Sequence, residues 1–237
     1  MSSIRRLLRL DARVPPSSPS TLRACGGCVE AACSRGARRS PALFLDRDGV
    51  IVEEVDHLHR PEDVRLLDGA AALIRRANEL RIPTIVITNQ AGVGRGMYDW
   101  AAFLRVTATI DDALARQGAR IDAVYACPFH HEGVAPYRHP NHPARKPNAG
   151  MFHRAAEECR VDLGGSWFIG DHSDDILAAR EGGLHGAVHL LTGHGPHHRE
   201  RVLQMPARAL HVAVTTDLEE AFALIPLLAG PAGAGRA

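Results

Sequence analysis

Residues 42–51 of this 237-residue chain read ALFLDRDGVI. The first four are apolar without interruption, which is the form of a short parallel strand that is buried on both faces. Asp46 and Asp48 follow directly. Acidic side chains are seldom buried without a partner, so packing alone does not explain two of them behind such a strand. The stretch therefore predicts a buried strand that ends in a pair of functional acids.

The rest of the chain repeats this alternation of strand and helix. Further strands are expected over 84–88, 123–126, 167–169, 187–191 and 211–214. Helices are expected over 68–80, 99–116, 149–159, 173–181 and 217–224, and the His-rich stretch 194–198 is expected to be a mobile loop. Regular alternation of this kind predicts an α/β fold with a doubly wound, mainly parallel sheet.

Composition and charge narrow the possible partners. Hydrophobic residues make up 45% of the chain, which suits one globular domain, and the formal net charge is only +1. A nearly balanced charge argues against a nucleic-acid or membrane-surface partner and favours a small phosphorylated substrate in a local pocket. No apolar run reaches the length of a membrane span. A monomer or a small homo-oligomer is expected.

The cysteines and the two ends of the chain set the expected boundaries. Five Cys in an uneven distribution do not form a disulfide framework, which predicts the reducing cytoplasm as location. Residues 1–40 are rich in Arg and Ser and predict a disordered extension, 41–226 a folded domain, and 227–237 a flexible tail. Alternatives for the first segment are a start codon placed too early, a targeting peptide, or a metal knuckle. The knuckle would use Cys25, Cys28 and Cys33.

Polar residues follow the expected strands where a doubly wound sheet binds its ligands, beyond the carboxyl ends. Thr88 ends the second strand, Asp171 follows the fourth, and Lys146 precedes the helix that leads to the fourth. Phosphate monoesters repel nucleophiles, so a carboxylate that attacks phosphorus needs a divalent cation to cancel that repulsion. Magnesium prefers oxygen ligands and commonly takes one or two carboxylates, which Asp46 and Asp171 can supply.

The remaining groups fit the same chemistry. Asp48 lies two residues after the expected nucleophile Asp46 and can reach the leaving oxygen, where a general acid belongs. Thr88 can hydrogen-bond a phosphoryl oxygen, and Lys146 can neutralise charge that develops during transfer. The set predicts a magnesium-dependent phosphatase.

Four motifs in this order resemble those of the haloacid dehalogenase superfamily. Residues 44–51 resemble its first motif, 87–90 its second, Lys146 its third, and 170–175 its fourth. The resemblance implies a capless fold of this superfamily, or one with a minimal loop cap. The short gaps between the expected elements leave no room for a large cap domain.

A narrower resemblance is to the D-glycero-D-manno-heptose 1,7-bisphosphate phosphatase and histidinol-phosphatase group. It rests on the Asp-Arg-Asp-Gly of the first motif, on TNQAGVGRG over 88–96, on Cys127-Pro128, and on Arg-Lys-Pro over 145–147. It implies Asp46 as nucleophile, Asp48 as acid/base, and Mg²⁺ held by Asp46, by the Asp48 main-chain carbonyl and by Asp171. Thr88 and Lys146 would hold the phosphoryl group. The implied substrate contacts are Glu54, Val55, Asp56, His57, Asn89, Gln90, Ala91, Arg145 and His172, the last in place of a common Lys.

Relatives in this group carry a structural zinc on a Cys-x-His and a Cys-x-Cys, and here that pattern is degenerate. Cys127 remains, but Phe129, His142 and Ala144 stand at the other three positions. The standard zinc site is therefore expected to be broken, and packing of Phe129 and Tyr137 is expected to order the loop instead. Nearby histidines leave a rearranged Cys/His site open as an alternative. These are His130, His131 and His139.

The favoured function is hydrolysis of D-glycero-D-manno-heptose 1,7-bisphosphate to the 1-phosphate through an aspartyl-phosphate. A histidinol-phosphate phosphatase or another sugar-phosphate phosphatase is the alternative. A nucleic-acid-end phosphatase would require a basic stripe along the site, which the charge balance does not favour. A non-catalytic phosphate-binding protein would be expected to lack Asp46, Asp48 or Lys146, and all three are present.

Overall fold

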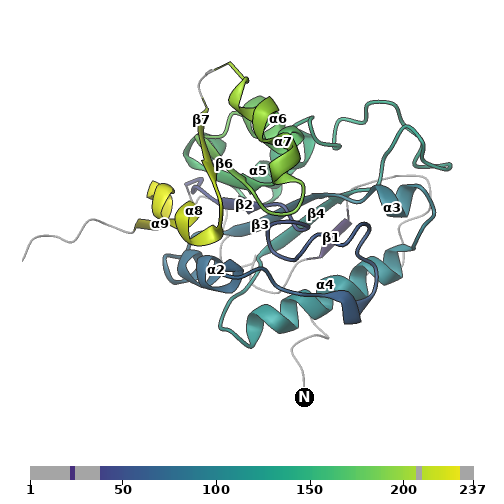
Figure 1. Cartoon of the computed structure of the whole chain (residues 1–237), viewed down its shortest axis with the longest axis horizontal. Helices are drawn as coiled ribbons and strands as arrows, with labels where there is room; N and C mark the ends of the chain where they lie inside the picture. Colours follow the sequence, from purple (N-terminus) through teal and green to yellow (C-terminus); the bar gives the residue numbers. More distant parts are fainter. Residues whose placement is uncertain (1–21, 25–37, 207–209, 230–237) are drawn as a thin grey trace, which may run out of the picture.

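The computed structural model describes residues 22–24, 38–206 and 210–229, which form one sheet with helices on both faces (Figure 1). The strands are β1 Leu22–Ala24, β2 Leu43–Leu45, β3 Thr84–Asn89, β4 Ala123–Cys127, β5 Trp167–Gly170, β6 Gly186–Leu190 and β7 His211–Thr215. The helices are α2 Ala70–Glu79, α3 Ala91–Gly94, α4 Trp100–Ala115, α5 Gly150–Glu158, α6 Ser173–Glu181, α7 Gly195–Leu203, α8 Leu218–Leu224 and α9 Pro226–Ala229. Short 3₁₀ turns occur at Pro61–Asp63 and Leu163–Gly165.

The strand order is β1-β4-β3-β2-β5-β6-β7, and every pairing from β4 to β7 is parallel. The predicted doubly wound, mainly parallel sheet is therefore confirmed. The chain passes from β2 to β3 on one side and later returns to β5 on the other, so the order reverses at β2. Ligands bind at such a switch point, beyond the carboxyl ends of the strands.

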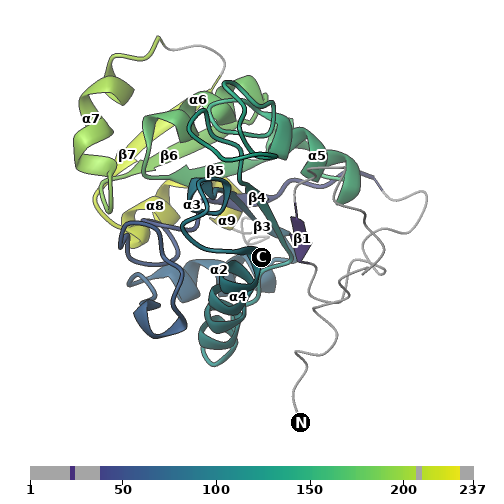
Figure 2. The ribbon, with the colours of Figure 1, turned by 90° about the vertical axis from the view of Figure 1, so that its right-hand side faces the viewer.

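The central strand β2 is buried on both faces because its residues alternate between two cores. Leu43 and Leu45 join the cluster built with α2, α4, α8 and α9, whereas Phe44 joins the cluster built with α5 and α6. The Phe44 and Phe152 rings meet edge to face at 5.0 Å between centroids. Figures 1 and 2 show the two helical layers on opposite sides of the sheet. This explains why the strand has no polar position.

Side-chain caps fix where two helices near the site begin. The Asp99 carboxylate accepts a 2.7 Å hydrogen bond from the Ala102 amide and starts α4. At α6, His172 Nδ1 accepts from the Asp174 amide at 3.1 Å, and the Asp175 carboxylate accepts from the His172 amide at 3.0 Å. This reciprocal capping box satisfies two amides that a helix start leaves without partners. It also directs the Asp175 side chain toward Lys146 at the carboxyl ends of the strands.

The ends of the described fold differ from the predicted boundaries. Leu22–Ala24 pairs antiparallel with β4, although the sequence gave no indication of a strand there. The candidate metal ligands Cys25, Cys28 and Cys33 lie outside the described residues, as does most of the predicted extension. At the other end, α9 continues to Ala229, inside the predicted tail, because Leu228 is buried in the core.

The prediction of a mobile loop over 194–198 is wrong, since Gly195 begins the nine-residue helix α7. Pro196 occupies the first turn, where proline is well tolerated, and Val202 anchors the helix in the core. One buried apolar side chain leaves no helical period in the sequence, which is why the helix was missed. Within the described ranges, no helix is long and apolar enough to cross a membrane.

Candidate active site

The expected functional residues converge at the carboxyl ends of β2, β3 and β5. They surround a hollow of about 250 Å³. Its lining is Asp46, Arg47, Asp48, Glu54, Asp56, His57, Thr88, Asn89, Gln90, Ala91, Tyr98, Arg145, Lys146, Asp171, His172, Asp174, Asp175 and His194. Of the residues predicted for the site, Val55 alone is absent from this lining, and its side chain is turned to solvent with 42% of its surface exposed.

Lys146 lies at the centre of the site and is buried between two carboxylates. Its Nζ is 2.8 Å from Asp46 Oδ2 and 2.6 Å from Asp175 Oδ1, and it donates to the Ile87 carbonyl at 3.1 Å. Burial lowers the pKa of Lys146, but Asp175 and Asp46 outweigh burial and raise it above its usual value. The ammonium group therefore stays charged beside the expected nucleophile.

Three carboxylates form a compact acidic cluster beside this lysine. Oxygens of Asp46, Asp171 and Asp175 all lie within 4.8 Å of one another. Burial raises the pKa of Asp46 to about 6, with Lys146 opposing the shift and Asp175 adding to it. Burial, followed by the charges of Asp175 and Asp46, raises the pKa of Asp171 to about 8. The raised pKa values show that negative charge is unfavourable here without a counter-charge. A hard divalent cation such as Mg²⁺, which prefers oxygen ligands, would supply that charge.

Asp48 is held away from this cluster by an arginine that the sequence did not single out. The Arg47 guanidinium donates from Nε to Asp48 Oδ1 at 2.9 Å and from Nη2 to Asp48 Oδ2 at 2.7 Å. Gln90 Nε2 also donates to Asp48 Oδ2 at 3.2 Å. Arg47 is buried and lies over the Phe103 ring at 5.4 Å. A paired guanidinium and carboxylate of this geometry keeps Asp48 at the rim of the hollow.

Asn89 has a structural task that differs from the predicted substrate contact. Its Nδ2 donates to the Lys146 carbonyl at 3.2 Å, and its Oδ1 accepts from the Lys146 amide at 3.1 Å. Both ends of the side-chain amide thus fix the main chain of Lys146. Thr88 Oγ1 accepts from Gln90 Nε2 at 2.9 Å, which leaves the Thr88 hydroxyl hydrogen free to donate.

The residues expected to contact the substrate border the hollow in two groups. Arg145 donates from Nη1 to the Phe129 carbonyl at 3.1 Å, which ties the rim to the 127–145 loop. On the opposite side the His172 ring lies 3.6 Å from that of His198, and His194 Nε2 is 3.8 Å from Glu54 Oε2. Short loops thus border the hollow, as expected for a capless fold.

Asp175 is the main functional residue that the sequence left without a role. The pair Asp174-Asp175 belonged to the fourth motif, but the spacing alone did not reveal which of the two turns inward. The capping box turns Asp175 toward Lys146, and Asp174 stays half-exposed. Arg47 stands between two acids in the sequence, but its pairing with Asp48 depends on packing. Tyr98 gave no signal, and His194 was noted only as part of the His-rich stretch 194–198.

Two of the four positions of the degenerate zinc pattern, Phe129 and His142, take part in aromatic packing. The Phe129 and His142 rings stack 3.6 Å apart, and Tyr137 meets Phe129 edge-on at 5.8 Å. His142 Nδ1 accepts from the Ala144 amide, so that nitrogen is already used. Within the described ranges, Cys127 belongs to no group of three potential metal ligands. These residues do not fit a tetrahedral zinc site.

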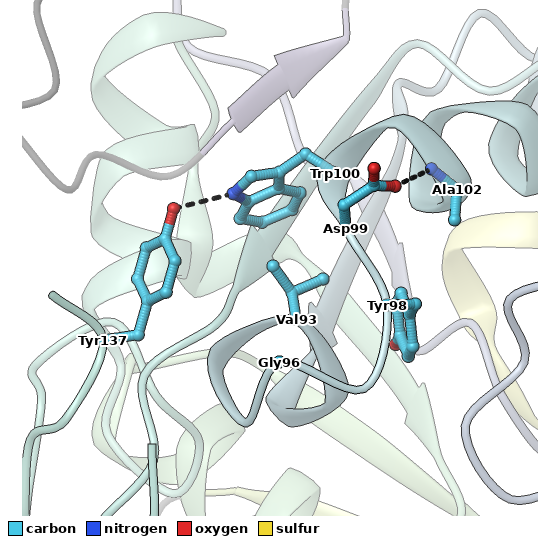
Figure 3. Close-up of a pocket in the computed structure, with 7 residues that line it drawn as sticks. All are labelled: Val93, Gly96, Tyr98, Asp99, Trp100, Ala102 and Tyr137. Carbon is cyan, nitrogen blue, oxygen red and sulfur yellow. Dashed lines mark hydrogen bonds between the residues drawn. The ribbon is translucent and has the colours of Figure 1, made fainter. Parts of the chain in front are cut away.

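A second hollow of about 520 Å³ lies on the other side of Tyr98 (Figure 3). Its walls include Tyr98, Trp100 and Tyr137, and Trp100 Nε1 donates to the Tyr137 hydroxyl at 3.0 Å. Asp99 is its one charged lining residue. An aromatic hollow with a single carboxylate does not suit a phosphate, so the phosphate chemistry belongs to the first hollow.

Comparison with known proteins supports the same superfamily. A family model described as "HAD-hyrolase-like" matches residues 143–221. A D-glycero-beta-D-manno-heptose-1,7-bisphosphate 7-phosphatase of Mesorhizobium japonicum is 40% identical over 61% of this chain and 66% of its own length. The corresponding enzyme of Yersinia pestis is 33% identical over 65% of this chain and 81% of its own. A D-glycero-alpha-D-manno-heptose-1,7-bisphosphate 7-phosphatase of Burkholderia mallei is 41% identical, over 62% and 77%.

Solved structures agree with this result. A HAD-like phosphatase from Mesorhizobium loti superposes with a TM-score of 0.78 at 29% identity, covering 92% of this chain and 99% of that one. D,D-heptose 1,7-bisphosphate phosphatase from B. bronchiseptica, complexed with magnesium and phosphate, gives 0.64 at 30% identity, covering 75% and 93%.

The sheet order, the acidic cluster and the buried lysine define a phosphatase of the haloacid dehalogenase superfamily, a phosphoric monoester hydrolase. Within that superfamily, the chain belongs to the family of D-glycero-D-manno-heptose 1,7-bisphosphate 7-phosphatases.

Proposed function

We propose that the protein removes the 7-phosphate of D-glycero-D-manno-heptose 1,7-bisphosphate and releases the 1-phosphate. The observation that carries the proposal is the cluster of Asp46, Lys146 and Asp175 at the switch point of the sheet, in a chain whose relatives are named for this reaction. A bisphosphate also suits a hollow with Arg145 at its rim, since a guanidinium recognises phosphate well.

In this mechanism Asp46 attacks phosphorus, and the phosphoryl group passes to its carboxylate as the bond to the sugar oxygen breaks. Asp48, released from Arg47 and carrying a proton taken up from solvent, donates that proton to the sugar oxygen. Asp48 then accepts a proton from the water that attacks the aspartyl-phosphate, which releases phosphate and restores Asp46. The Thr88 hydroxyl and the Lys146 ammonium stabilise the charge on the transferring group.

Asp46 and Asp171 would hold Mg²⁺ together with the main-chain carbonyl of Asp48. Asp175 would orient Lys146 through the ion pair with its ammonium group. When bound, the cation neutralises the phosphate and the nucleophile, which lowers their mutual repulsion. A solved relative complexed with magnesium and phosphate supports this part of the proposal. We place the enzyme in the cytoplasm, where both described cysteines, Cys127 and Cys159, would remain free thiols.

The test is a phosphate-release assay of the purified chain with Mg²⁺. The panel contains both anomers of heptose 1,7-bisphosphate, because the relatives include enzymes named for each anomer. Histidinol phosphate, hexose phosphates and a 5′-phosphorylated oligonucleotide complete it. We expect the highest kcat/KM on a heptose bisphosphate. Preference for histidinol phosphate would instead support the alternative, and preference for the oligonucleotide would overturn the proposal.

A further inference from the structure

The carboxylate of Asp171 is enclosed by two loops that come from distant parts of the chain. Both loops approach it with a glycine of positive φ, Gly49 at +74° and Gly193 at +46°. A Cβ on Gly193 would be 2.5 Å from Asp171 Oδ2 and 3.0 Å from the Gly49 Cα. A Cβ on Gly49 would overlap the same carboxylate. Only glycine fits at either position, so both loops pack directly against the Asp171 carboxylate.

Hydrogen bonds join the same three parts. The amide of His194 donates to Asp171 Oδ2 at 2.8 Å, and the Thr192 hydroxyl donates to the carbonyl of Gly49. Gly49 follows Asp48, whose main-chain carbonyl is the third proposed magnesium ligand. The segment Thr192–His194 therefore contacts one proposed ligand directly and fixes the peptide next to another.

The segment Thr192–His194 is itself fixed by hydrogen bonds at the residue that follows it, Gly195. The buried His189 on β6 makes a 3.0 Å hydrogen bond through Nε2 to the Gly195 carbonyl. The Gly195 amide donates to the Thr192 carbonyl at 2.7 Å. A short loop held at both ends and lacking room for a Cβ is a rigid support. Supports of this kind orient the groups that ligate a metal.

We propose that Thr192–His194 is a positioning segment that sets the affinity of the site for Mg²⁺ by holding Asp171 and Gly49, the residue after the Asp48 carbonyl, in register. The proposal rests on the proposed function for its metal ligands. Its residues touch the ligands rather than the substrate, so its effect falls on cation binding first. Loss of an outer group of this kind typically weakens metal affinity by about 10–100-fold.

The test is calorimetric titration of the full chain with Mg²⁺, together with the rise in melting temperature that Mg²⁺ produces. Thr192→Val removes the hydroxyl at nearly constant volume and is expected to weaken Mg²⁺ binding by about 10–100-fold. Thr192→Ser keeps the donor and is expected to restore it. Gly193→Ala is expected to abolish measurable binding.

Gly183→Ala is the matched control, because Gly183 also has a positive φ, +70°, but a Cβ there meets no atom within 4 Å. It introduces similar backbone strain and is expected to leave Mg²⁺ affinity unchanged. Thr192→Val and Gly193→Ala proteins that bind Mg²⁺ within twofold of wild type would overturn the inference, as would a wild-type chain that binds none. A wild-type chain that binds Mg²⁺ but releases no phosphate would defeat the proposed function alone, because affinity is measured without substrate.

Discussion

The acidic cluster and the 127–145 loop adjoin the same edge of the sheet but are ordered by opposite means. The cluster of Asp46, Asp171 and Asp175 is held by one ammonium group and contains more negative than positive charge. The loop is held by the Phe129 and His142 rings, stacked 3.6 Å apart, with no charge at the contact. The first region should therefore depend on a divalent cation, and the second should not.

The two regions meet at Arg145 and Lys146. Arg145 reaches back to the Phe129 carbonyl, and Lys146 reaches forward to Asp46. The aromatic contact thus orders the loop that ends at Arg145, and Lys146 next to it forms ion pairs with the acidic cluster. Dispersion and ring stacking at Phe129 and His142 do not release when metal is withdrawn.

The sharpest break in the cluster is Asp46→Asn. An amide cannot attack phosphorus, so we expect activity below roughly one per cent of wild type with the fold retained. Phosphate release and circular dichroism measure the two effects. Asp111→Asn, which removes a half-buried carboxylate on α4 remote from the hollow, should leave the rate unchanged. Appreciable turnover by Asp46→Asn would refute Asp46 as the nucleophile.

Chelation separates the two regions without mutation. Dialysis against EDTA should abolish activity, and Mg²⁺ should restore it, because the acidic cluster needs a cation to accept a phosphate dianion. The 127–145 loop should remain ordered throughout, which proteolysis at its exposed residues can follow. Full activity in chelator would show that the cluster works without a cation.

The sequence predicted the cluster better than the loop, and the reason is local. Asp46, Thr88 and Asp171 each follow an apolar run at a strand end, so their convergence follows from parallel pairing alone. Asp175 and Arg47 act through contacts that depend on how α6 is capped and how α4 packs, which no spacing reveals.

In the fold, the central strands were predictable because each contains a short apolar run. β1 lies in a segment without an apolar period, and α7 buries little. The predicted packing of Phe129 against Tyr137 is confirmed, but the closer stacking on His142 was not foreseen.

Phe129→Ala tests the aromatic region. It removes a buried ring that contacts His142, Tyr137 and His139, so we expect a loss of about 3 kcal/mol, or roughly 6–12 °C in melting temperature. KM should also rise, since the Phe129 carbonyl holds Arg145. His131→Ala on the same loop, with a side chain 66% exposed, is the control and should change neither. Equal melting temperatures for the two variants would show that the stack does not order the loop.

The pH dependence of stability should follow the acidic cluster. The pKa values of Asp46 and Asp171 in the folded chain, about 6 and about 8, both exceed the ordinary 3.8. From about pH 4 to about pH 8 these two carboxyl groups bind more protons in the folded chain than in the unfolded chain. Their contribution to the free energy of unfolding therefore falls as pH rises over this range. Mg²⁺ should reduce this fall by replacing the protons.

Urea unfolding at about pH 5 and about pH 8, in EDTA and in Mg²⁺, measures the effect. Asp171→Asn should flatten the metal-free profile. Histidines whose pKa burial lowers, among them His189 and His198, change the stability in the opposite direction, so the comparison is between wild type and Asp171→Asn. A metal-free profile that Asp171→Asn leaves unchanged would contradict the assignment of the cluster.

The smallest expected effect concerns zinc, and it tests whether the 127–145 loop is ordered without a metal. We expect the purified chain to carry less than about half an equivalent of zinc, because a structural site needs four Cys or His ligands in tetrahedral geometry. Phe129 and Ala144 cannot ligate, and the His142 ring is already stacked. Burial also raises the pKa of Cys127 to about 11, which disfavours the thiolate that zinc requires.

Elemental analysis after dialysis decides the question, and Cys127→Ser refines it. Without a metal role for the thiol, this nearly isosteric change should leave zinc content and activity as in wild type. His130, which is partly buried, lies close enough to the exposed His131 and Glu132 to share an ion, so zinc added in excess can bind there. Such binding should be weak, lost on dialysis and unaffected by Cys127→Ser. One zinc per chain that survives dialysis and disappears with activity in Cys127→Ser would show that the loop rearranges around a metal and that aromatic packing alone does not order it.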